Sequence, residues 1–248
     1  MTTAIQTAGL TRRIPGVISR TLIDNVDLTV EKGEFVAIIG PSGSGKSSLL
    51  YLLGLLDAPT EGEVSLFGQP TSDMTESQKA ELRLKAIGFV FQFHYLLPEF
   101  SALNNVLMPM KTLGRLSAQE MRERGVALLS SLGLAAEVDK RPFQLSGGQC
   151  QRVAIARALA NDPEIVMGDE PTGNLDSVST EQVFGILRDL ASKGRTVCIV
   201  THDLGLAGRA DRQIRLVDGK IDKISSRRKE AVTLEGEAAG NRSVGSGK

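Results

Sequence analysis

Residues 35–48 read FVAIIGPSGSGKSS and decide the fold of this 248-residue chain. The apolar run at 35–39 is typical of a strand that is buried on both faces of a sheet. The segment at 40–47 fits the pattern G-x-x-x-x-G-K-[ST], and the run SLLYLLGLL at 48–56 predicts a buried helix. A strand, a glycine-rich loop and a helix in this order predict a phosphate-binding loop.

This loop can bind phosphate through its backbone and through two side chains. Its successive N–H groups form a nest for an anion, and the start of the helix adds partial positive charge. Lys46 would contact the β- and γ-phosphates, and the Ser47 hydroxyl can bind Mg²⁺. The alternative, a glycine turn that contains lysine by chance, is disfavoured by the flanking strand and helix. The expected nucleotide-binding residues are Gly40, Pro41, Ser42, Gly43, Ser44, Gly45, Lys46, Ser47 and Ser48.

Two carboxylates close a second apolar strand. Residues 165–168 read IVMG and lead directly to Asp169 and Glu170. Ligands of doubly wound sheets bind at the carboxyl ends of the strands, so this pair should lie beside the phosphate loop. Asp169 would hold Mg²⁺ through water, and Glu170 would orient or deprotonate the attacking water. In isolation, the pair could equally be a solvated acidic turn.

His202 follows a third apolar strand, predicted at 196–200. From the end of that strand its imidazole could reach the γ-phosphate. A lone histidine is more often structural, so the catalytic interpretation depends on the three strands being parallel.

A second glycine-rich segment, LSGGQ at 145–149, precedes the helix predicted at 147–160. Ser146 is a good N-cap residue, and the two glycines after it leave backbone N–H groups uncovered at the helix start. The segment therefore predicts a second anion site in a chain that already has one. The alternative is a capped helix whose glycines only allow close packing.

The remaining periodicity predicts an α/β fold with a mainly parallel sheet. The further strands are expected at 5–11, 26–30 and 64–67, and the further helices at 75–87, 102–113, 117–132 and 178–192. The helical middle of the chain predicts an inserted α-helical subdomain at about 93–160. Asp218 and Gly219 predict a hairpin turn, and the polar residues 225–248 predict a mobile tail.

Composition narrows the classes of function. Lys and Arg total 29 and Asp and Glu total 29, so a net charge of zero gives no footprint for broad nucleic-acid binding. The apolar runs are far shorter than the roughly 20 residues of a membrane span, and the N-terminus lacks a signal-peptide pattern. Cys150 and Cys198 predict reduced thiols in a cytosolic protein.

The motifs occur together in a specific order: the loop at 40–47, Gln92, LSGGQ at 145–149, the Asp169–Glu170 pair, GNLD at 173–176 and His202. Over residues 5–222 this arrangement resembles the ATP-binding subunits of ABC transporters. The resemblance implies a P-loop NTPase core of RecA type over residues 1–224 and hydrolysis of ATP with Mg²⁺.

The resemblance also implies a head-to-tail homodimer. ATP would lie between the phosphate loop of one copy and the second glycine-rich segment of the other, and Asp176 would lie near the two-fold axis. The implied catalytic residues are Glu170, His202 and Gln92, and the implied metal ligands are Ser47, Gln92 and Asp169. The residues that the second copy would supply to the nucleotide are Ser146, Gly147, Gly148 and Gln149, and Asp176, which would couple the two sites, is also expected to bind the nucleotide.

The chain departs from the family pattern at three positions. Ile14 stands about where an aromatic ring is expected to stack on adenine, which makes the contact with the base apolar. Gly168 and Cys150 replace residues that are often alanine and a polar residue. The first departure bears on selectivity for adenine.

Five of the ten aromatic residues fall between 89 and 100. We expect Phe89 and Phe91 to pack in the core and the others to form a docking surface for integral membrane subunits over residues 93–105, from Phe93 to Asn105. Three segments are similar to the lipoprotein-releasing ABC ATPases, the LolD family: residues 93–105, LLYLLGLLDAPTEGEV at 49–64 and GDEPTGNLDS at 168–177. That resemblance implies a peripheral location at the cytoplasmic face of the inner membrane. The alternatives are a macrolide-exporter-type ATPase, a soluble ABC protein acting on nucleic acid, and a small-molecule kinase.

Overall fold

The computed structural model describes residues 2–16 and 19–227. Its larger sheet has six strands in the order β10-β9-β3-β8-β7-β6, and all of their pairings are parallel except β9 with β10. Its strands are β3 (Phe35–Ile39), β6 (Ile87–Phe91), β7 (Ile165–Asp169), β8 (Thr196–Val200), β9 (Arg212–Val217) and β10 (Lys220–Ser226). The carboxyl ends of β3, β7 and β8 therefore meet at one edge of the sheet, as the sequence predicted.

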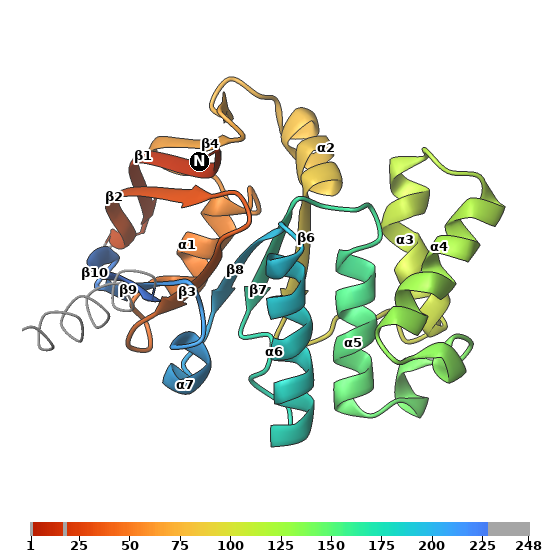
Figure 1. Ribbon diagram of the computed structural model, residues 1–248. Coiled ribbons are helices and arrows are strands. Elements are labelled where there is room, and N and C mark those ends of the chain that lie inside the picture. The colour runs from red at the N-terminus through yellow and green to blue at the C-terminus, as the bar shows by residue number, and fades with distance from the viewer. Residues whose placement is uncertain (1, 17–18, 228–248) are drawn as a thin grey trace, which may run out of the picture.

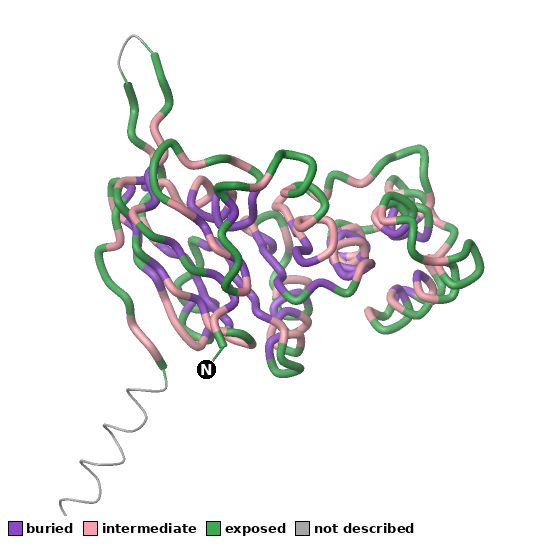
Figure 2. The backbone as a smooth tube through the Cα atoms, turned by 90° about the horizontal axis from the view of Figure 1, so that it is seen from above, coloured by how far each residue is buried: buried purple, intermediate pink, exposed green. Residues whose placement is uncertain are grey.

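A second, antiparallel sheet has the order β2-β1-β4-β5. Its strands are β1 (Thr3–Ile14), β2 (Arg20–Glu31), β4 (Glu61–Leu66) and β5 (Gln69–Pro70). β1 and β2 extend beyond the predicted 5–11 and 26–30. Their outer ends are exposed but remain paired, for example Arg13 with Thr21, so the backbone ladder continues where the apolar pattern has stopped. Figure 2 shows these ends projecting from the body of the molecule.

The helices are α1 (Lys46–Leu53), α2 (Glu76–Ala86), α3 (Ala102–Leu113), α4 (Ala118–Ser131), α5 (Gly147–Ala158), α6 (Ser177–Ser192) and α7 (Leu204–Ala207), with two short 3₁₀ turns, η1 (Ala135–Glu137) and η2 (Pro142–Gln144). Five helices match the predicted segments to within about two residues at their ends, whereas α1 ends three residues before the predicted 56 and α7 was not predicted. The boundaries agree because capping residues mark them: Thr75 with Gln78, and Ser117 with Glu120, form capping boxes.

Three apolar clusters hold these elements together. One face of the six-stranded sheet packs against α1 and the antiparallel sheet, and the other face packs against α6, α7 and part of α5. The third cluster lies among α3, α4 and α5, to one side of the sheet (Figure 1). Because α5 contributes to both the second and the third cluster, it joins the helical part to the sheet.

The hairpin turn expected at Asp218 and Gly219 joins β9 to β10, with φ values of 48° and 76°. β10 continues through Ser226, so the fold includes the first two residues of the segment expected to be a tail. Residues 228–248 of that segment lie outside the described residues. Within residues 2–16 and 19–227, none of the helices is long and apolar enough to cross a membrane.

Candidate active site

The phosphate-binding loop turns tightly because it passes close to two neighbouring backbones. A Cβ atom on Gly40, at φ 150°, would lie 2.1 Å from the Leu216 carbonyl oxygen, and one on Gly45, at φ 96°, would lie 2.4 Å from that of Leu22. No side chain caps the first turn of α1, whose N-cap residue is Gly45. The start of this helix therefore presents backbone N–H groups that an anion can bind.

Lys46 lies across the loop. Its Nζ atom donates hydrogen bonds to the carbonyl oxygens of Gly40, at 3.0 Å, and of Pro41, at 2.9 Å. Ser44 is turned inward: its hydroxyl is buried and has no partner among the described residues, and its N–H donates to Pro41. Ser44 was expected to bind phosphate, but its side chain is buried and supports the conformation of the loop.

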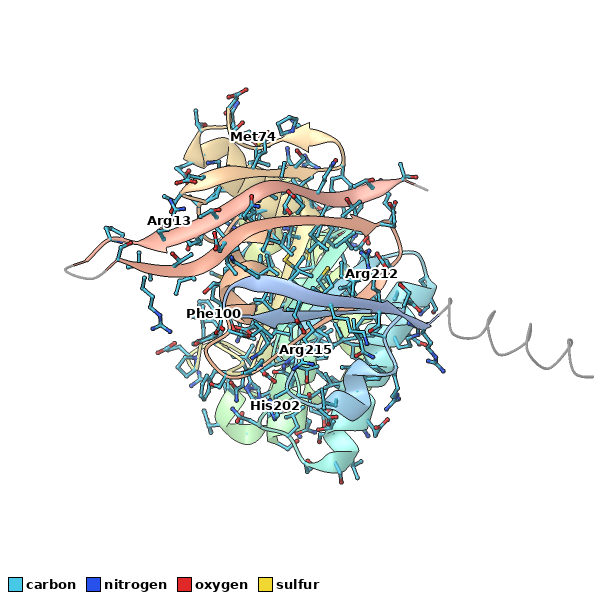
Figure 3. The ribbon with its side chains drawn as sticks, turned by 90° about the vertical axis from the view of Figure 1, so that its left-hand side faces the viewer. Arg13, Met74, Phe100, His202, Arg212 and Arg215 are labelled. Carbon is cyan, nitrogen blue, oxygen red and sulfur yellow. The ribbon has the colours of Figure 1, made fainter. Side chains whose placement is uncertain are left out.

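A cavity of about 360 Å³ opens beside the loop and brings most of the expected residues together. Ser42, Gly43, Gly45, Lys46, Ser47 and Ser48 line it, with Glu170, Val200, Arg20 and Leu22. Gly40 and Pro41 line a neighbouring cavity of about 560 Å³ with His202 and Arg215. His202 and Arg215 lie on the same side of the molecule in Figure 3.

Asp169 lies at the end of β7 and accepts two hydrogen bonds from α1. Ser47 Oγ donates to its Oδ1 atom at 2.8 Å, and the Tyr51 hydroxyl donates to its Oδ2 atom at 2.5 Å. Burial and the bond to Asp169 raise the pKa of Tyr51 well above its usual range, so this hydroxyl remains a donor. Tyr51 was not among the predicted site residues, although its spacing of four residues from Ser47 places both on one helix face.

Glu170, the residue after Asp169, has a left-handed backbone at φ 50°. Its N–H donates to the Val200 carbonyl, which ties this turn to the end of β8. The Glu170 Oε2 atom lies 2.8 Å from His202 Nδ1. The sequence placed both residues near the γ-phosphate, and the structure puts them in direct contact.

Gln92 follows the end of β6 and faces the GNLD loop. Its Nε2 atom donates to Asn174 Oδ1 at 3.2 Å, and a Cβ atom on Gly173 would lie 3.0 Å from the same nitrogen. Asp176 is the N-cap of α6 and accepts bonds from the Ser179 N–H, at 2.9 Å, and hydroxyl, at 2.8 Å. These bonds lower the pKa of Asp176, so it is ionised at neutral pH.

The second glycine-rich segment begins α5 as the sequence predicted. Ser146 Oγ accepts from the Gln149 N–H at 3.2 Å, and Gln149 Oε1 accepts from the Ser146 N–H at 2.9 Å. A Cβ atom on Gly148 would lie 2.4 Å from Ser179 Oγ, whereas one on Gly147 would meet only Leu175 Cδ2, at 4.0 Å. One glycine therefore allows close packing against α6 and the other leaves the helix start open.

The sites on the two helix starts are separate in one copy of the chain. The cavity lined by Lys46 and Glu170 has no wall from residues 145–149. Ile14, at the end of β1, is 45% exposed. Among the residues that the structure describes, none that lines either cavity beside the phosphate loop is aromatic.

Strand-end carboxylates and a phosphate loop on this sheet define a nucleotide-hydrolysing protein. A family model described as ABC transporter matches residues 23–173. The chain is 50% identical to the lipoprotein-releasing system ATP-binding protein LolD 1 of Chlorobium chlorochromatii (strain CaD3), over 90% of each chain. It is 51% identical to LolD of Aquifex aeolicus (strain VF5), over 81% of this chain and 89% of that one.

The solved structures similar to this chain include two of the ATP-binding cassette MJ0796. One is a dimer in a post-hydrolysis state with ADP and Pi, with 41% identity and a TM-score of 0.84 over 90% of this chain and 98% of that one. The other dimeric structure has 42% identity and a TM-score of 0.83 over the same shares. The chain belongs to the ABC transporter family, and within it the chain is an ATP-binding, ATP-hydrolysing subunit of a membrane transport system.

Proposed function

We propose that this chain drives the release of lipoproteins from the bacterial inner membrane by closing and reopening a homodimer around ATP. The observation that carries the proposal is the separation of two half-sites on one chain. Lys46 and Glu170 line one cavity, while the anion site at Ser146 begins a different helix outside it. Each half would be completed by the other copy, and the names of the LolD relatives supply the transport system.

Within each site we assign roles by contact. Lys46 exchanges its bonds to the loop carbonyls for the β- and γ-phosphates, and the backbone N–H groups of the α1 start bind the same anion. Glu170 accepts a proton from the attacking water, and His202 holds the Glu170 carboxylate at 2.8 Å while reaching the γ-phosphate. Asp176 would lie near the two-fold axis of the dimer.

Mg²⁺ fits the oxygen atoms at the end of β7. The Ser47 hydroxyl and the Asp169 carboxylate are hard donors 2.8 Å apart, and Gln92, directly after the neighbouring strand β6, would supply Oε1 as a third oxygen. Mg²⁺ usually retains water and phosphate oxygens, so a site with few protein ligands suits it. When bound, the ion would neutralise charge on the phosphates.

For docking of the membrane subunits we assign the exposed rings after β6. Phe93 is 60% exposed and Tyr95 65% exposed, whereas Phe89 packs against the core and stacks on Phe91. Phe100, labelled in Figure 3, is also exposed. A cavity of about 760 Å³ between α2, α3 and β6 lies nearby and has Phe91 in its wall. Docking there would place the chain at the cytoplasmic face of the membrane, with residues 93–160 as the helical subdomain.

Site-specific crosslinking tests this assignment. A photoreactive phenylalanine at position 93 should crosslink to an integral membrane protein in native membranes, and the same group at Ile224, which is 44% exposed on β10, should not. Purified membranes should then release a labelled lipoprotein only when ATP is added. Membrane crosslinks from Ile224 but not from position 93 would contradict the docking surface, and release of a macrolide in place of lipoprotein would contradict the cargo.

A further inference from the structure

Gln151 is a buried amide that has no role in the chemistry described above. It lies in the second turn of α5 and is 1% exposed. Its Nε2 group donates to the carbonyl oxygens of Phe91, at 3.1 Å, and of Pro171, at 2.6 Å. Phe91 directly precedes Gln92, and Pro171 directly follows Glu170. One side chain thus bonds to the backbone next to Gln92, assigned to Mg²⁺, and next to Glu170, assigned to the attacking water.

The orientation of this amide follows from its surroundings. With Nε2 and Oε1 exchanged, an acceptor would face two carbonyl oxygens. As placed, Oε1 is buried and has no partner among the described residues. A buried acceptor without a donor is unfavourable, which offsets part of the stability that the two donated bonds contribute. The contribution of Gln151 lies in what its two donated bonds hold in place.

The helix that carries Gln151 connects the two halves of the molecule. Ile155 packs into the cluster on the sheet, while Val153 and Ala156 pack into the cluster of α3 and α4. The same helix begins with the second anion site at Ser146. A shift of α5 relative to the sheet would therefore move Ser146 and strain both bonds of Gln151 together.

We propose that Gln151 is a positioning residue that couples the second anion site to the orientation of Gln92 and Glu170. The inference rests on the proposed function, in which Ser146 binds the γ-phosphate held by the partner copy. Phosphate binding fixes α5, and the bonds to Phe91 and Pro171 then fix the two loops. Hydrolysis therefore depends on closure of the dimer, although Gln151 does not touch the nucleotide.

Gln151→Met tests the coupling because methionine keeps the length and volume of the side chain and removes both donors. We expect kcat to fall by about tenfold to hundredfold, the cost of misplaced catalytic groups. Both anion sites remain intact, so the affinity of a single copy for nucleotide should change by less than about threefold. When Gln151→Met is added to the Glu170→Gln variant, the Mg·ATP concentration that causes dimerisation should also change by less than about threefold. Gln151→Asn, which retains an amide too short to reach both carbonyls, repeats the test if the methionine variant does not fold.

Thr7→Val is the matched control for stability. Thr7 is 4% exposed, its hydroxyl donates to the Val26 carbonyl at 2.8 Å and accepts from the Leu28 N–H at 2.9 Å, and it is not among the described residues that line the two cavities beside the phosphate loop. This variant should melt at a lower temperature with unchanged kcat. The proposal is overturned if Gln151→Met turns over within about twofold of the parent, or if Thr7→Val lowers kcat equally. Failure of Glu170→Gln alone to dimerise would overturn the proposed function and this inference with it.

Discussion

The starts of α1 and α5 are both glycine-rich, yet their first turns are built differently. At α1 the N-cap is Gly45, and no side chain occupies the N–H groups of the first turn. At α5 the N-cap Ser146 and Gln149 bond to each other's backbone and take up two of those donors. The first site can thus bind a triphosphate within one copy. The second site has fewer free N–H donors and is suited to a phosphate that is already bound at another site.

Glu170→Gln should have the largest effect because it removes the base while keeping both anion sites. Loss of a positioned general base costs about 10²- to 10⁴-fold in rate, so hydrolysis should fall by that factor with ATP binding preserved. Release of free phosphate measures the rate. Glu164→Gln is the control, because Glu164 lies just before the first residue of β7, at the opposite end of the strand from Glu170, and pairs with Lys32. Normal turnover in Glu170→Gln would remove Glu170 from the reaction.

Lys46→Ala weakens the anion site at the start of α1 and leaves the site at the start of α5 unchanged. Loss of a charge-assisted bond to phosphate costs about 1.5–3 kcal/mol, so the Kd for ATP of a single copy should rise about tenfold to hundredfold. Titration with a fluorescent ATP analogue measures this. Lys32→Ala, at the ion pair with Glu164, should bind normally. Equal affinity of the Lys46 variant and the parent would contradict the phosphate-loop assignment.

Ser146→Ala tests the second site alone. Affinity of a single copy for ATP should be unchanged, while the ATP concentration needed for dimerisation should rise about tenfold, as expected for one lost hydrogen bond to a charged group. Losing the N-cap also costs about 1 kcal/mol of stability. Ser117→Ala separates the two effects, because Ser117 caps α4 with an equivalent capping box. If both variants dimerise equally poorly, the defect is one of stability.

Tyr51→Phe should have the smallest effect, confined to the first site. Its hydroxyl orients the Asp169 carboxylate, and loss of such an outer contact lowers metal affinity by about tenfold or more; because Ser47 still donates to Asp169, we expect the lower end. Hydrolysis should need more Mg²⁺ for half of its maximal rate, with nucleotide affinity in the absence of Mg²⁺ unchanged. An unaltered Mg²⁺ requirement would show that Tyr51 only supports packing.

The sequence predicted the elements well where local signals are strong. Helix ends with capping residues, such as Ser117 and Ser146, and the buried strands at 165–169 and 196–200 were found to within about two residues. The extent of β1 and β2 was underestimated because their outer ends are polar and paired only through the backbone. No local signal records that kind of pairing.

The site residues also divide into those that a local sequence signal marks and those that only the packing brings together. The residues of the phosphate loop, Asp169, Glu170 and His202 could be found because each follows an apolar strand in the chain. The Glu170–His202 contact and the two bonds of Gln151 join residues more than 19 positions apart, so they follow from packing and the left-handed turn at Glu170. In the sequence Gln151 stands in the mixed polar and apolar segment GGQCQRVAIARA, so nothing local marks it as buried.

The most direct test of the account is the mass of the Glu170→Gln variant in light scattering, with and without saturating Mg·ATP. If two copies share each ATP, this 26.5 kDa chain should change from single copies to a species of about twice that mass, and Ser146→Ala should shift the transition to higher ATP concentration. Single copies at every concentration of Mg·ATP, with nucleotide bound, would contradict the shared site.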